Sequence, residues 1–218
     1  MLKKSLVSLL SFGLALFLLK TPILVADSNT KSGTPNPPEV VRARIGAEIQ
    51  AGTERRPAKG YERVQAADKF RVYALPETQA AYVYAVFADQ KTVELLNPSA
   101  QTPLPPAALL LLPGCEEWYA FEALGPLVTL TLISSATPLP ELEALLKTPQ
   151  NLSAWRDMEK NLLAQSKLEL STAALKPYVL AGGARDCNSA TNDAFLADLK
   201  ISSGKGMVIK KYEFHIQE

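Results

Sequence analysis

The residues that could carry out chemistry are few and lie far apart along this chain of 218 residues. His215 is the only histidine, so any Ser–His or Cys–His nucleophile system would have to use it. It lies near the C-terminus, on the polar side of an alternating segment. This position favours an ordinary exposed side chain over a catalytic base.

Two further patterns suggest ligand binding, but their details do not fit. The GGARDC segment at residues 182–187 lacks the Gly-Lys-Ser/Thr ending of a phosphate-binding loop. Asp186, Asp193 and Asp198 do not match the alternate-residue carboxylates of a calcium loop. We therefore expect a plain turn and solvated acids, with no metal ion and no cofactor.

The pair Glu116 and Glu117, beside Trp118 and Tyr119, suggests a glycosidase-like acid pair next to a sugar-stacking ring. Adjacent residues on a strand point to opposite faces, which argues against joint action. A weak hydrolase or hydrolase accessory domain using Glu116 or Glu117 is the second functional hypothesis. Trp118 itself is expected in the core.

Aromatic residues form the main candidate for a binding surface. Tyr73, Tyr82, Tyr84 and Trp118 could bind a peptide or glycan if they lie together at a sheet edge. If they lie inside a sandwich, they are simply packing residues. The sequence leaves both readings open.

Cys115 and Cys187 are the only cysteines. In an oxidising compartment the pair predicts a disulfide, which would contribute ~4 kcal/mol through chain entropy. Two separate thiols or metal ligands are the alternatives, although two thiols and one histidine are a poor set for a closed zinc site.

An oxidising compartment is expected because residues 1–26 read as a secretory signal. Lys3 and Lys4 precede an uncharged, leucine-rich run, and Ala26 supplies a small residue before a polar stretch. The run is shorter than the ~20 residues that span a bilayer. If the signal is not cleaved, residues 5–25 would act as a membrane anchor. Otherwise the mature chain is expected to be periplasmic or extracellular, with no further membrane contact.

Removal of this segment changes the charge balance. The loss of Lys3, Lys4 and Lys20 leaves 20 basic residues against 22 acidic ones, a balance of about −2. Such a surface gives no electrostatic attraction to nucleic acid, so none is expected as a partner.

The chain that follows is predicted to be mostly β. Residues 27–38 are a small, polar, Pro-rich linker. Val41, Ala43, Ile45, Ala47 and Ile49 then alternate with polar residues and Gly46, which predicts a strand with one buried face. Further strands are predicted at 70–75, 81–87, 91–96, 108–112, 118–121 and 128–133. Residues 81–87 are expected centrally, because the run 83–87 is apolar on both faces.

From residue 139 the period shifts toward 3.6, which predicts a helix from Pro140, a second with its apolar stripe between Leu152 and Leu163, and a third at 190–200. The chain closes on a strand in which Tyr212, Phe214 and Ile216 share the buried face, while Lys210 and Lys211 fit an edge position. The predicted fold class is α+β: an antiparallel β-sandwich of about seven strands at 39–138, followed at 139–218 by a helical extension and a closing strand packed on the sandwich.

Scattered residues between 39 and 138 resemble a known family. They are Gly60-Tyr61, Asp68, Ala81-Tyr82-Val83-Tyr84, Asp89, Val93-Glu94-Leu95-Leu96-Asn97-Pro98, Leu111-Leu112-Pro113, Phe121, Gly125-Pro126 and Ile133-Ser134-Ser135. This pattern is similar to the bacterial domain of unknown function 4384, a small β-sandwich of exported proteins with no established catalytic residues. The resemblance implies a non-enzymatic module for binding, sensing or assembly at the cell envelope. Its partner would be an envelope protein, a peptide or a glycan.

Overall fold

Two β-sheets packed face to face form the fold, as the alternating apolar residues predict. The computed structural model describes residues 40–97, 100–121, 125–147, 151–166, 169–170 and 189–217. The predicted signal and linker therefore lie outside the described residues, as do Cys187, Asp186 and the glycines of the 182–187 segment. Within the described residues, no helix is long and apolar enough to cross a membrane.

The first sheet has two long strands at its centre and short ones at its margins. Its order is β10 (Glu169–Leu170), β11 (Ser202–Lys205), β1 (Val40–Ala51), β4 (Lys69–Pro76) and β7 (Leu110–Leu112), with β2 (Glu54–Pro57) paired to β1 and β8 (Tyr119–Ala120) paired to β4. All of these pairings are antiparallel.

The second sheet contains the closing strand. Its order is β3 (Tyr61–Gln65), β12 (Met207–Gln217), β9 (Leu127–Ser135), β5 (Tyr82–Ala88) and β6 (Val93–Leu95). The predicted sandwich with a closing strand is confirmed. The predicted edge position of Lys210 and Lys211 agrees with the pairing, because among the described residues these two pair with β9 alone. Residues 213–217 also have β3 beside them, in parallel.

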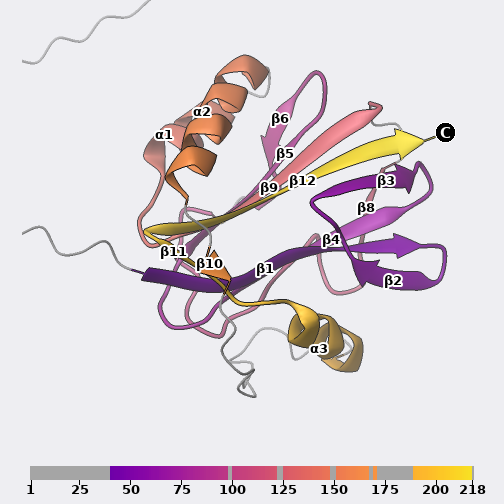
Figure 1. Cartoon of the computed structure of the whole chain (residues 1–218), viewed down its shortest axis with the longest axis horizontal. Coiled ribbons are helices and arrows are strands. Elements are labelled where there is room, and N and C mark those ends of the chain that lie inside the picture. The colour runs from indigo at the N-terminus through magenta and orange to yellow at the C-terminus, as the bar shows by residue number, and fades with distance from the viewer. Residues whose placement is uncertain are drawn as a thin grey trace, which may run out of the picture. The chain divides into compact units, whose positions relative to one another are not determined.

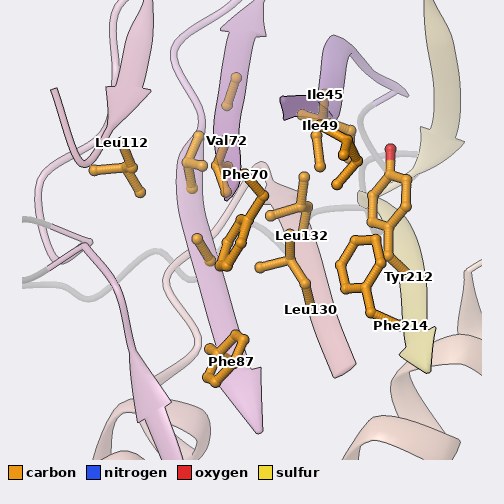
Figure 2. Packing of buried hydrophobic residues seen from close by; sticks show 14 of the residues in the cluster. Ile45, Ile49, Phe70, Val72, Phe87, Leu112, Leu130, Leu132, Tyr212 and Phe214 are labelled. Carbon is orange, nitrogen blue, oxygen red and sulfur yellow. The ribbon is translucent and has the colours of Figure 1, made fainter. Parts of the chain in front are cut away.

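The core between the sheets is built from side chains of one parity on each strand. Figure 2 shows Phe70 and Val72 of β4 meeting Leu130 and Leu132 of β9, with Tyr212 and Phe214 of β12 beside them. Tyr212 and Phe214 are buried as predicted, whereas Ile216 is only half-buried. The aliphatic and aromatic side chains interdigitate across the two sheets, so each sheet is stabilised by the other.

Helices cover the outer faces of both sheets (Figure 1). Helices α1 (Pro140–Leu146) and α2 (Leu152–Gln165) pack on the second sheet, where Leu142 and Trp155 join a cluster with Tyr84, Ile133 and Ile209. Helix α3 (Ser189–Asp198) packs on the first sheet, where Phe195 lies 4.5 Å from Tyr73 between ring centroids.

Helix α3 also explains why β1 is not half-exposed, as its pattern predicts. Arg44, on the polar parity, is buried and donates from Nη1 to the carbonyls of Leu196 and Leu199 at 3.3 and 3.2 Å. These carbonyls lie at the C-terminal end of α3, where a cation is favourable. Gly46 permits the close approach, since a Cβ there would lie 2.6 Å from a Leu199 methyl carbon.

The first half of β12 lies against the free edge of β1. Residues 44–47 of β1 have β4 on one side and no strand on the other among the described residues. Lys210 Nζ donates to the Ile45 carbonyl at 2.8 Å, and the Ala47 amide hydrogen-bonds the Tyr212 hydroxyl. Burial lowers the pKa of Lys210. An inward-pointing charge at a strand edge discourages pairing with another molecule.

Candidate functional site

One hollow of the described surface lies between α2 and the second sheet. This cleft has a volume of about 480 Å³, within the ~300–1,000 Å³ typical of small-molecule sites. The face of α2 supplies Leu152, Trp155, Arg156, Glu159, Lys160 and Leu163; the strands supply Ala88, Leu127, Thr129, Lys211 and Glu213; and the β5–β6 turn adds Asp89 and Gln90.

The helical period explains the α2 wall. Leu152, Arg156, Lys160 and Leu163 form one stripe along α2, and Trp155 and Glu159 form the neighbouring stripe turned toward the sheet. Trp155 and Glu159 are buried, whereas Arg156 and Lys160 are exposed at the rim. The helix therefore presents a mixed apolar and charged surface to the cleft.

A chain of charged groups holds the cleft together. Glu159 is only 6% exposed, and a carboxylate is rarely so buried unless it is paired. Thr131 Oγ1 donates to Glu159 Oε1, and Lys211 Nζ lies 3.0 Å from Glu159 Oε2 and 3.1 Å from Glu213 Oε1. Burial alone would lower the pKa of Lys211, but its bonds to the two carboxylates outweigh this effect and raise the pKa. The ammonium thus stays charged and ties β12 to α2.

The β5–β6 turn closes one side of the cleft through Asp89. The backbone amides of Lys91 and Thr92 donate to Asp89 Oδ1 at 2.7 and 2.6 Å. Desolvation would raise the pKa of Asp89, but these amide bonds outweigh it and lower the pKa. The carboxylate is therefore ionised, and it is occupied by hydrogen bonds from the backbone of its own turn.

A second hollow, of about 620 Å³, lies between α1 and α2. Its walls are mainly apolar, with Leu139, Leu142, Leu145, Met158, Leu162 and Met207 among them. Its polar lining residues, Glu141, Asp157, Asn161 and Gln165, include no cation, so it lacks the mixed charges of the first cleft and is the weaker candidate for specific recognition.

The structure does not bring the three predicted tyrosines together. Tyr73 is buried on the first sheet beneath α3, and its hydroxyl donates to Glu48 Oε2 at 2.7 Å. Tyr84 is buried on the second sheet; its hydroxyl donates to Glu143 at 2.8 Å and accepts from the Leu139 amide at 2.9 Å. Tyr82 is half-buried beside the Tyr84 cluster. A binding role for these residues stays a prediction.

Trp118 does not lie in the core, contrary to expectation. It is half-buried, with the guanidinium of Arg71 4.1 Å and that of Arg55 5.2 Å from the ring centre. Arg71 Nε also donates to the carbonyl of Glu117 at 2.7 Å. These cation–π contacts fasten the loop before β8 to the first sheet.

The remaining predicted residues are placed as follows. Glu116 and Glu117 are exposed, and Cys115 is half-buried in the same loop. Because Cys187 lies outside the described residues, the disulfide stays a prediction. His215 is half-buried against the exposed Tyr61, 4.6 Å away between ring centroids. Among the described residues, no group of three or more His, Cys, Asp or Glu could hold a metal ion.

Sequence reasoning did not single out the cleft. Its charged groups come from the β5–β6 turn, α2 and β12, and residues of different elements meet only after the chain has folded. The available sign was the polar parity of Lys211 and Glu213, which shows that these residues leave the core but not that α2 covers them.

Comparison with known proteins identifies no relative of this chain. No family model, no curated protein and no solved structure matches the chain. The resemblance to the domain of unknown function therefore stays an expectation.

The buried tyrosines predict a specific pH dependence. Burial raises the pKa of Tyr84 and of Tyr212 to about 12, whereas an unfolded tyrosine titrates near pH 10. Between these values the unfolded chain binds fewer protons, so the free energy of unfolding should fall as pH rises from about 10 to 12. We expect a loss of ~1.4 kcal/mol per pH unit for each tyrosine in urea titrations.

The double variant Tyr84→Phe/Tyr212→Phe serves as the test, because it removes both titrations and should reduce the slope. Burial also raises the pKa of Tyr73 and of Tyr119, so part of the dependence should remain. Burial lowers the pKa of Lys210 below 10.5, so the titration of this group makes the free energy of unfolding rise with pH, but only up to about pH 10.5. An unchanged slope between pH 11 and 12 in the double variant would show that these hydroxyls do not control alkaline stability.

Proposed function

We propose that the chain is an exported, non-enzymatic β-sandwich module that binds a component of the bacterial cell envelope, in a sensing or assembly role. The observation that carries the binding role is the cleft beneath α2. It combines apolar walls with several charged groups, of which Glu159, Lys211 and Glu213 are positioned by bonds that link β9, α2 and β12. Such a preformed, mixed surface suits recognition of a ligand. Export and envelope location rest on the secretory pattern of residues 1–26.

The proposal is tested by retention of an envelope component. Expressed in an exporting host, the chain should be recovered outside the cytoplasm with an N-terminus near Asp27. Immobilised, it should retain a protein or small molecule from an envelope extract. Thr129→Phe should abolish retention, because a bulky ring would fill the cleft floor while removing only a 3.5 Å hydrogen bond to the Ala88 carbonyl. Mass spectrometry of the eluate is the readout.

Thr53→Phe is the matched control, since Thr53 is exposed in the β1–β2 turn, outside the cleft. It should retain the same component as the wild type. Intact residues 1–26 on soluble cytoplasmic protein would refute export. Equal retention by the wild type and Thr129→Phe would refute the cleft as the binding site.

A further inference from the structure

The charged groups of the cleft differ in whether they already have a hydrogen-bond or ion-pair partner. All three of its carboxylates have partners: Asp89 accepts from its turn amides, Glu159 from Thr131 and Lys211, and Glu213 pairs with Lys211. Lys211, the innermost cation, is shared between two of them. None of these four groups is therefore left to attract a ligand charge.

Two cations at the rim, Arg156 and Lys160, have no such partner among the described residues. Within the described part of the chain, Arg156 and Lys160 have no carboxylate within 4.0 Å and no hydrogen-bond acceptor. They lie four residues apart on α2, where like charges destabilise a helix. An anion placed between them would relieve this repulsion and gain two charge-assisted contacts. The free charge of the cleft therefore favours an anionic group.

Apolar residues flank these cations along α2 and face them across the cleft. Leu152 and Leu163 continue the same stripe of α2, and Leu127 with Ala88 lies across the cleft on the sheet. Both α2 leucines are half-buried, so part of their surface still faces water. A ligand that covers either of them would gain from the removal of apolar area from water.

We propose that this cleft binds an amphiphile with one anionic headgroup, held by Arg156 and Lys160, and an apolar chain that runs along the cleft against Leu127 and one of the two α2 leucines, Leu152 or Leu163. The inference rests on the proposed function and specifies its ligand. A fatty carboxylate and an alkyl phosphate share this chemistry, and the volume of about 480 Å³ suits a molecule of that size.

The test is calorimetric titration of the full chain with decanoate and with decyl phosphate, each below its micelle concentration. At least one should bind with a one-to-one ratio, and the tighter of the two identifies the headgroup. Removing methylenes from its chain should weaken binding roughly fourfold each. Arg156→Gln/Lys160→Gln should weaken binding at least about tenfold. Lys200→Gln/Lys205→Gln removes the same charge from exposed positions outside the cleft and should change nothing.

Decyltrimethylammonium, which carries the opposite charge, should bind far more weakly than decanoate. Equal binding of the two, or equal binding by both glutamine variants, would overturn the anionic site. Failure of both anions to bind, while Thr129→Phe still abolishes retention of an envelope component, would overturn the amphiphile and leave the proposed function standing. If the immobilised chain retains a peptide and no anionic amphiphile from the envelope extract, the amphiphile proposal is likewise overturned while the proposed function stands.

Discussion

Deletion of residues 211–218 should prevent soluble expression or sharply lower the melting temperature. The deletion removes all pairing of β12 with β3 and about half of its pairing with β9. It also removes Tyr212 and Phe214 from the core, each worth about 1.5–3 kcal/mol when buried. A typical domain is stable by only ~5–15 kcal/mol, so this loss is a large share of the total. Thermal melting followed by circular dichroism measures it.

His215→Ala is the control within the same segment. The imidazole lies on the outer face of β12, and its ring contact is with Tyr61, an exposed side chain. Its removal should change the free energy of unfolding by less than about 1 kcal/mol. A truncated chain that melts with the full-length protein would show that β12 is dispensable, and its assignment to the core of the second sheet would be wrong.

Strands with one continuous apolar parity could be predicted from the sequence. In β1, β4, β5, β9 and β12 every second side chain faces the opposite sheet, and a period of two records this directly. The strands β2 and β3 could not be predicted from this pattern, because their sequences, ERRP and YERVQ, are mostly charged or polar. The strand β11 could not be predicted from it either, because Ser202, although fully buried, is neither apolar nor large.

What covers each sheet could not be predicted in the same way. Periodicity separates two faces but does not identify the element that packs on either one. Arg44 and Glu48 look like solvated residues of β1 and are instead buried on its outer face. Lys211 looks like a surface charge of β12 and instead pairs with Glu159 of α2. Such polar contacts join residues far apart in sequence, so no local pattern encodes them.

Phe70 is the residue whose truncation should cost the core most. It comes from β4, and its ring lies 5.0 Å from Tyr119 and from Phe121, 5.9 Å from Phe87 and 6.2 Å from Phe214, between centroids. These neighbours belong to both sheets, so the ring links the two halves of the sandwich. Replacement of a buried Phe by Ala removes its apolar area and leaves a cavity, at a typical cost of about 3–5 kcal/mol.

For a chain of this size, that loss should lower the melting temperature of Phe70→Ala by roughly 6–20 °C. Tyr61→Ala is the matched control, because Tyr61 is an aromatic strand residue that is 58% exposed. It should lose less than about 1 kcal/mol, mainly its contact with His215. Urea titration of both variants gives the comparison in free energy. If Phe70→Ala loses no more stability than Tyr61→Ala, the aromatic cluster does not hold the two sheets together, and the core has a different centre.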